Sequence, residues 1–271
     1  MTVLAREAAA YHEDGFVIVR APAVTKMKED LTAAMGAAAR KLIARDPVLG
    51  TRAGPAPTAP FHEVMDWCVA NEQDHAVSRA CYELFPALID MVALVGHPLL
   101  VGLCRRLGIS DPLPSTLPAV RIDRPHQERF LSPAHQDFWS SMLSLNGAVI
   151  WCPLVPMEAD MGRLEVVRGS HRAGVLPYRH HSDEWPYTTR TAFDDSAFEA
   201  VDVPDDGLLY FSQLLLHRSG FNVSRRTRVT LQVRYNDFDT LAAPTSSFVP
   251  KYSTFVIQEQ QRRLAGGEGA R

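Results

Sequence analysis

The chain has 271 residues, of which 46% are hydrophobic and 22% are charged, and its formal net charge at pH 7 is -3. This composition suits one fairly large globular domain with a sizeable core. The small negative charge gives no electrostatic argument for binding nucleic acid or an anionic membrane surface. The sequence contains no apolar run of about eighteen residues, so no membrane-spanning helix is predicted.

Two features indicate the cellular compartment. The first seven residues lack the basic and then apolar pattern of a secretory signal peptide. The four cysteines are scattered without CxxC spacing, at Cys68, Cys81, Cys104 and Cys152. We expect them to be reduced, mostly buried thiols of a cytoplasmic protein.

The first part of the chain, residues 1–115, is predicted to be rich in helices. Helix formers at helical spacing predict helices over residues 4–14, 24–45, 71–95 and 98–107. Gly15 breaks the first of these and precedes a short β-prone run at 16–20. Residues 48–60 are rich in Pro, Gly, Thr and Ala, which predicts an irregular loop.

From about residue 117 the pattern changes to short β-prone runs between turn signals. These runs are 118–123, 144–154, 163–167, 199–203, 207–212 and 226–236. Such a rhythm is typical of an all-β sandwich or barrel. The segment 172–198, which contains His180 and His181, is long for a connection, and such length is common in lids and binding loops. Residues 241–271 form a C-terminal extension whose last residues we expect to be disordered.

Two histidines and one aspartate are the most informative residues of the chain. His135 and Asp137 are two positions apart, and alternate residues of an extended segment point to the same side. His217 follows the β-prone run 207–212 and could approach them from a neighbouring strand. Two imidazoles and one carboxylate are the ligands of a non-heme iron(II) facial triad, which leaves coordination positions open. A His-x-Asp pair alone is a weak signal, so the neighbouring motifs decide its weight.

The run 228–235 alternates strictly between polar and apolar side chains. Its apolar members, which could pack on a core, are Val229, Leu231, Val233 and Tyr235. Its polar members are Arg228, Thr230, Gln232 and Arg234. The polar face is either a solvated surface or the lining of a barrel mouth, where Arg228 could bind a carboxylate with its planar fork.

Four segments together resemble the phytanoyl-CoA dioxygenase family of iron(II)- and 2-oxoglutarate-dependent oxygenases. They are AHQD at 134–137, VIWCPL at 149–154, MGRLEVVRGSH at 161–171, and the block from His217 to Arg228. The last two are similar to the family patterns Gly-x-Leu-x-x-x-x-Gly-Ser-His and His-x-Ser…Arg. The resemblance covers roughly residues 8–240. One departure is Arg168, which stands where relatives often have Pro.

The resemblance implies an α+β fold that is mainly β, with a helical cover on a double-stranded β-helix (jelly-roll) core. We expect the core at about 116–240, within a single domain that spans residues 1–271.

The resemblance also implies roles for individual residues. The iron(II) ligands would be His135, Asp137 and His217. The distal carboxylate of 2-oxoglutarate would be held by Arg228 and Ser219, and further candidate contacts of this cosubstrate are Trp151 and Gln127. Candidate substrate contacts are Phe138, Trp139 and Arg121, of which Arg121, like Gln127, is expected on the strand before the metal motif.

The implied activity is an oxidation in which dioxygen converts 2-oxoglutarate to succinate and carbon dioxide while a substrate is hydroxylated. Halogenating relatives lack the metal-binding carboxylate, so an intact Asp137 favours hydroxylation, desaturation, epimerisation or ring closure. The polar segment 172–198 favours a small polar metabolite of natural-product or carbohydrate biosynthesis over an acyl-CoA. The alternative is a non-oxidative jelly-roll protein, such as a metal-dependent isomerase or lyase or a sugar-binding module. The sequence predicts no oligomeric state.

Overall fold

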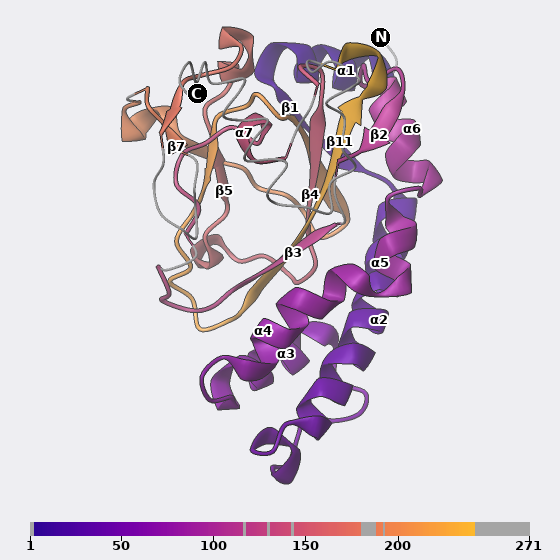
Figure 1. Ribbon diagram of the computed structural model, residues 1–271, viewed down its shortest axis with the longest axis vertical. Coiled ribbons are helices and arrows are strands. Elements are labelled where there is room, and N and C mark those ends of the chain that lie inside the picture. The colour runs from indigo at the N-terminus through magenta and orange to yellow at the C-terminus, as the bar shows by residue number, and fades with distance from the viewer. Residues whose placement is uncertain are drawn as a thin grey trace, which may run out of the picture.

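The computed structural model describes residues 3–115, 118–128, 131–141, 144–179, 188–191 and 193–241. A large sheet lies at its centre, with helices α2 to α5 on one side and strand β5 on the other (Figure 1). Residues 242–271 of the expected C-terminal extension lie outside the described ranges, as do His180 and His181.

The large sheet has six antiparallel strands in the order β1-β9-β4-β11-β2, with β3 also paired to β11. Their bounds are β1 Phe16–Arg20, β2 Pro112–Pro114, β3 Ala119–Asp123, β4 Ala148–Pro153, β9 Gly207–Ser212 and β11 Arg228–Asp237. Because β1 and β2 precede residue 116, the sheet extends beyond the range of 116–240 expected for the core.

A smaller sheet of three strands faces the large one, in the order β10-β5-β8. Its strands are β5 Leu164–Val166, β8 Glu199–Ala200 and β10 His217–Ser219. His135 pairs with His217 in an isolated antiparallel bridge beside β10. A further hairpin joins β6 (Tyr178–Arg179) to β7 (Thr188–Thr189). The fold is therefore α+β with a jelly-roll core, as predicted.

The two faces of the large sheet bury different groups of side chains. The apolar face of β11 packs with the helices, because Val229, Leu231, Val233 and Tyr235 belong to the cluster that includes the helical core residues. The opposite face carries an inner cluster between the sheets, made of Phe16, Val149, Trp151, Leu164, Val166, Val201, Val203, Leu209, Phe211 and Leu215. Gln232 is directly opposite Trp151 and so shares this inner face. The polar side chains of β11 therefore line the interior of the jelly roll.

The helices expected over 4–14, 24–45 and 98–107 are present, whereas the helices Phe61–Asn71 and Phe138–Ser141 were not predicted. The described helices are α1 Val3–Asp14, α2 Pro22–Arg45, α3 Phe61–Asn71, α4 Ala76–Leu84, α5 Ile89–Leu94, α6 Pro98–Arg106 and the short α7 Phe138–Ser141. The single helix expected over 71–95 is wrong, because α3 ends at Asn71 and a 3-10 turn at Phe85–Ala87 separates α4 from α5. Pro86 in that turn has no N–H to continue an α-helix.

Among the described helices none is by itself long and apolar enough to cross a membrane, although the bent pair Ala76–Ala87 and Ile89–Arg106 meets the length and composition test together. The four cysteines are free and buried, and burial raises the pKa of each thiol. The cytoplasmic location stays a prediction.

Two glycines, Gly162 and Gly220, allow two backbone segments to pack closely just after the end of β10. Gly162 has φ +73°, and a Cβ there would lie 2.3 Å from the carbonyl oxygen of Gly220. The Gly220 N–H donates to the carbonyl of Arg163 at 2.9 Å, so the two segments cannot separate without losing this bond.

Replacing Gly162 with alanine is expected to lower the free energy of unfolding by about 3 kcal/mol, through left-handed strain together with the backbone clash. Urea unfolding followed by circular dichroism measures the change. Gly54→Ala is the control, because a Cβ at Gly54 meets nothing within 4 Å. Equal stability of the two variants would contradict this close packing.

Candidate metal centre

The structure brings His135, Asp137 and His217 together in the interior of the jelly roll. His135 and His217 exchange both backbone hydrogen bonds (2.9 and 3.1 Å), so their side chains leave neighbouring strands on the same side. Their ring centroids are 4.2 Å apart. The Oδ2 atom of Asp137 lies 3.6 Å from Nε2 of His217. One potential ligand atom from each residue lies within 4.8 Å of the others, and all three residues are buried.

Gln136 explains why its two neighbours point inward. Its Nε2 donates to the carbonyls of Gly174 (2.9 Å) and Leu214 (2.7 Å), and its Oε1 accepts from the N–H of Leu176 (2.8 Å). The side chain is thus held on the side of the strand away from the metal cluster. Only the alternation of the segment could have suggested this role from the sequence.

Both histidines are oriented by backbone carbonyls. Nδ1 of His135 donates to the carbonyl of Pro133 (2.7 Å), and Nδ1 of His217 donates to the carbonyl of Leu215 (3.0 Å). Because a carbonyl oxygen only accepts, each Nδ1 carries the proton and each Nε2 keeps its lone pair. This arrangement is the one that metal-binding histidines require.

The electrostatics of the cluster favour the same protonation states. Burial, with a contribution from His217, lowers the pKa of His135 to about 3, and burial also lowers the pKa of His217. Burial alone would raise the pKa of Asp137, but the Arg234 guanidinium and the two imidazoles outweigh it and hold this pKa below its ordinary value. At neutral pH the cluster therefore has neutral imidazoles and a carboxylate, which are the forms that bind a divalent metal.

A second charged cluster lies on the same inner face, on β3 and β11. Asp123 accepts from Nη2 of Arg121 (2.6 Å) through Oδ1, and from Nε of Arg228 (3.1 Å) through Oδ2. Nη1 of Arg228 also donates to the carbonyl of Gly220 (3.3 Å), and Arg228 is only 3% exposed. Burial alone would raise the pKa of Asp123, but the two guanidiniums hold it below its ordinary value. The two guanidiniums thus share one carboxylate on the inner face.

Two other cosubstrate candidates lie where the motifs suggested. Ser219 is opposite Leu164 in the small sheet, so its side chain shares the face of the inner cluster. Trp151 is buried in the inner cluster on β4. Gln127 is different, because β3 ends at Asp123 and the chain turns at His126, which has φ +54°. The expectation that Gln127 lies on the strand before the metal motif is therefore wrong.

Phe138 and Trp139 form a small cluster of their own beside the metal motif. They are 6% and 9% exposed and pack against Val175, Tyr178 and Leu214. Nε1 of Trp139 donates to the carbonyl of Leu176 at 2.8 Å, and the Trp139 and Tyr178 ring centroids are 4.3 Å apart. These contacts attach α7 to residues 174–178, the segment to which the side chain of Gln136 is also hydrogen-bonded.

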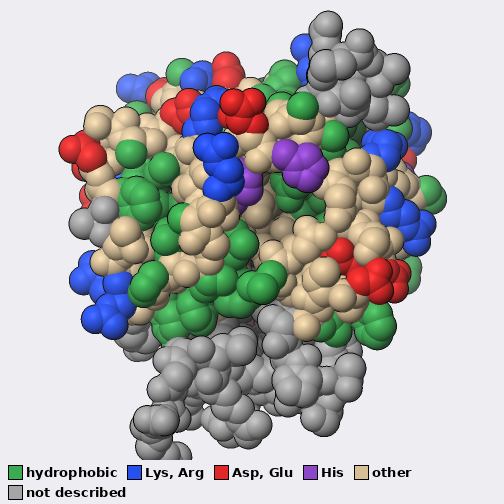
Figure 2. All heavy atoms as spheres, turned by 90° about the horizontal axis from the view of Figure 1, so that it is seen from above, with side chains coloured by type: hydrophobic (Ala, Val, Ile, Leu, Met, Phe, Trp, Pro, Cys, Tyr) green, Lys and Arg blue, Asp and Glu red, His purple; other side chains and the backbone are tan. Residues whose placement is uncertain are grey.

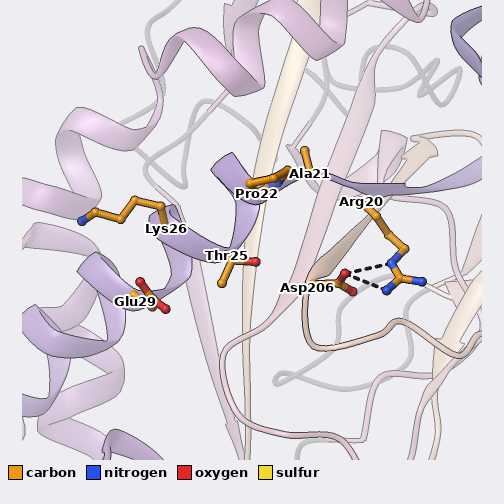
Figure 3. A pocket seen from close by; sticks show the side chains of 7 residues that line it. All are labelled: Arg20, Ala21, Pro22, Thr25, Lys26, Glu29 and Asp206. Atoms are coloured by element: carbon orange, nitrogen blue, oxygen red, sulfur yellow. Dashed lines mark hydrogen bonds and ion pairs between the residues drawn. The ribbon is translucent and has the colours of Figure 1, made fainter.

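The described part of the surface carries a pocket away from the metal cluster. On the face seen in Figure 2, basic and acidic side chains are interspersed, and histidine side chains near the centre adjoin basic as well as hydrophobic ones. A shallow pocket at the start of α2 contains Lys26 and Glu29 beside the ion pair of Arg20 with Asp206 (Figure 3). It lies at the Arg20 end of β1, whereas the opposite end of β1 is paired with Phe211, whose ring packs against His217. The pocket is thus separate from the metal cluster.

A jelly-roll core that encloses two imidazoles and a carboxylate defines a non-heme metal protein. The family model described as "Phytanoyl-CoA dioxygenase (PhyH)" matches residues 11–230, and the chain belongs to this family. Membership places it among the iron- and 2-oxoglutarate-dependent oxygenases, the class that the sequence motifs predicted.

Solved structures support the fold. The epimerase SnoN, solved with Fe3+, alpha ketoglutarate and nogalamycin RO, is similar with a TM-score of 0.57 and 20% identity, over 92% of this chain and 91% of that one. The non-heme monooxygenase ThoJ matches with a TM-score of 0.53 and 19% identity, over 84% and 76%. AviO1 from Streptomyces viridochromogenes Tue57 matches with a TM-score of 0.51 and 21% identity, over 90% and 100%. No curated protein gives a significant sequence match.

Proposed function

We propose that the protein uses iron(II) and 2-oxoglutarate to hydroxylate a small polar metabolite in natural-product or carbohydrate-type biosynthesis. The observation that carries the proposal is the buried cluster of His135, Asp137 and His217, whose donor atoms are already in metal-binding form. When bound, iron supplies the dioxygen chemistry that amino-acid side chains lack.

The three side chains would bind the metal through both Nε2 atoms and through Asp137. Three protein ligands leave room for a chelating 2-oxoacid and for dioxygen, which is the property of the facial triad. The protein contributes a buried site, since His135, Asp137 and His217 are each less than 10% exposed. Exclusion of water protects the reacting groups from side reactions.

The distal carboxylate of 2-oxoglutarate would bind at Arg228 and Ser219. Arg228 is a buried cation on the same inner face as the metal cluster, and a buried charge of this kind favours a bound anion, which supports this assignment. Trp151 would flank the cosubstrate beside Gln232, and Gln127 remains a proposed contact from the turn after β3.

The substrate would lie near Phe138 and Trp139, which directly follow the metal motif. Natural-product chemistry is supported by the printed descriptions of similar structures, which include an epimerase and a carbocyclase from nogalamycin biosynthesis. The retained Asp137 disfavours halogenation, and among the remaining outcomes hydroxylation is proposed because it is the usual one in this family. The non-oxidative alternative needs no cationic cluster for a dicarboxylate, and no described residue specifically favours it.

Purified protein with iron(II) and 2-oxoglutarate is expected to form succinate faster when a true substrate is present. We would measure succinate across a panel of glycosides, aminosugars and polycyclic natural products, with Asp137→Ala protein as the inactive control. Products identified by mass spectrometry would distinguish an added oxygen from desaturation or epimerisation. A wild-type protein that binds both cofactors but responds only to fatty acyl-CoA compounds would contradict the proposed substrate class.

A further inference from the structure

Arg234 on β11 contacts the aspartate of the metal cluster in a specific way. Its Nε and Nη2 atoms both donate to Oδ1 of Asp137, at 3.1 and 3.0 Å. The other oxygen, Oδ2, is the one that faces Nε2 of His217 at 3.6 Å. The two oxygens of this carboxylate are therefore in different environments, one bound by a guanidinium and one directed toward the imidazole.

The position of Arg234 is itself fixed by the centre of the sheet. Its backbone pairs with Val149 on β4, and its carbonyl accepts from the N–H of Ser115 at 3.0 Å. Nη2 also donates to Oε1 of Gln232, on the same face of β11. The next residue, Tyr235, anchors the strand on the other face through its hydroxyl, which donates to the carbonyl of Val95 at 2.9 Å. The guanidinium is thus held in place, with the side chain 14% exposed.

We propose that Arg234 is a positioning residue of the metal centre, which holds Oδ1 of Asp137 so that Oδ2 alone binds the metal. This inference rests on the metal site of the proposed function. A carboxylate bound through one oxygen occupies one coordination position, whereas a carboxylate bound through both would occupy a position that the cosubstrate or dioxygen needs. Outer hydrogen bonds of this kind commonly orient metal ligands.

The guanidinium has two opposing effects on a bound cation. Its positive charge offsets the negative charge of Asp137 and repels the metal, so removing it would tighten binding if charge were its main effect. Its two hydrogen bonds orient the carboxylate, so removing it would weaken binding if orientation dominates. The sign of the change in affinity therefore distinguishes the two effects.

The test measures Co(II) affinity without 2-oxoglutarate, by isothermal titration calorimetry on Arg234→Met and Arg234→Lys proteins. Positioning predicts a dissociation constant at least about tenfold higher in both variants, because lysine keeps the charge but not the planar fork. The visible absorption of bound Co(II) should also change, as the carboxylate becomes free to bind through both oxygens. An unchanged or lower dissociation constant in Arg234→Met would overturn the proposal. If that variant does not fold, Arg234→Lys decides by the same criterion.

Arg218→Met is the matched control. Arg218 is adjacent to His217 on β10 but donates to Glu165 (2.6 Å) and Asp195 (2.5 Å), so it also loses ion pairs beside a metal ligand. Its Co(II) affinity should equal that of the wild type. Thermal unfolding in chelator would confirm that each variant is folded before metal is added. Wild-type protein that binds no Co(II) would refute the metal site itself, whereas equal binding by wild type and both Arg234 variants would refute only the role of Arg234.

Discussion

Replacing Asp137 with alanine is expected to weaken iron(II) binding by more than about 100-fold. Loss of an outer hydrogen-bonding partner commonly costs about 10- to 100-fold in metal affinity, and loss of a ligand should cost more. The change also removes the anion that offsets Arg234, whose guanidinium would then face the cation directly. Anaerobic calorimetry with iron(II) measures the effect.

Two further variants make the Asp137 experiment specific. Asp137→Asn keeps the shape and an oxygen for Arg234 but removes the charge, so it should lose metal affinity with a smaller loss of stability. Asp137→Ala should also lower the free energy of unfolding by about 3 kcal/mol, because a largely buried guanidinium loses its carboxylate. Part of that loss should be recovered in the double variant Asp137→Ala/Arg234→Met. Wild-type iron affinity in Asp137→Ala would show that the metal binds elsewhere.

Replacing Arg228 with methionine is expected to raise the dissociation constant for 2-oxoglutarate by about 10- to 100-fold. Hydrogen bonds to charged groups contribute about 1.5–3 kcal/mol, and about 1.4 kcal/mol corresponds to a tenfold change. The variant also removes a buried positive charge from the inner face, where the carboxylate would bind. Titration of 2-oxoglutarate into Co(II)-loaded protein measures the constant.

Arg226→Met is the control for Arg228. Arg226 lies two residues earlier in the chain and donates to Glu158 at 2.6 Å, outside the inner face. It also lies 3.5 Å from Asp66, so its replacement removes ion pairs comparable in number. Its 2-oxoglutarate affinity should match that of the wild type. If Arg228→Met and Arg226→Met bind 2-oxoglutarate equally well, the assignment of Arg228 is wrong.

Local pattern predicted much of the fold but not the way distant segments combine. The alternation over 228–235 correctly predicted the buried apolar face of β11, and Pro98 begins α6 as expected. The run 16–20 was predicted as β-prone, but nothing local showed that it pairs with β9 almost two hundred residues later. The apolar spacing over 71–95 suggested one helix because it fits helical periodicity on both sides of Pro86. The chain nevertheless leaves the α-helix at Phe85–Ala87, because Pro86 cannot continue it.

The candidate site was predictable to the extent that it depends on motif spacing. His135, Asp137 and His217 were expected to converge, and the structure brings them together. Asp123 and Arg234 were missed as partners, because their contacts depend on the register of β11 with its neighbours. The sequence did point to Arg234, because it lies on the same polar face of the alternating run 228–235 as Arg228.

The most direct test of the central claim is anaerobic absorption spectroscopy of the metal-free protein titrated with iron(II) and then with 2-oxoglutarate. A chelated 2-oxoacid on iron(II) gives a weak visible charge-transfer band, and we expect this band in the wild type. It should be absent in His135→Ala and reduced in Arg228→Met at matched 2-oxoglutarate. Folded wild-type protein that gives no band at saturating iron(II) and 2-oxoglutarate would contradict the proposed function.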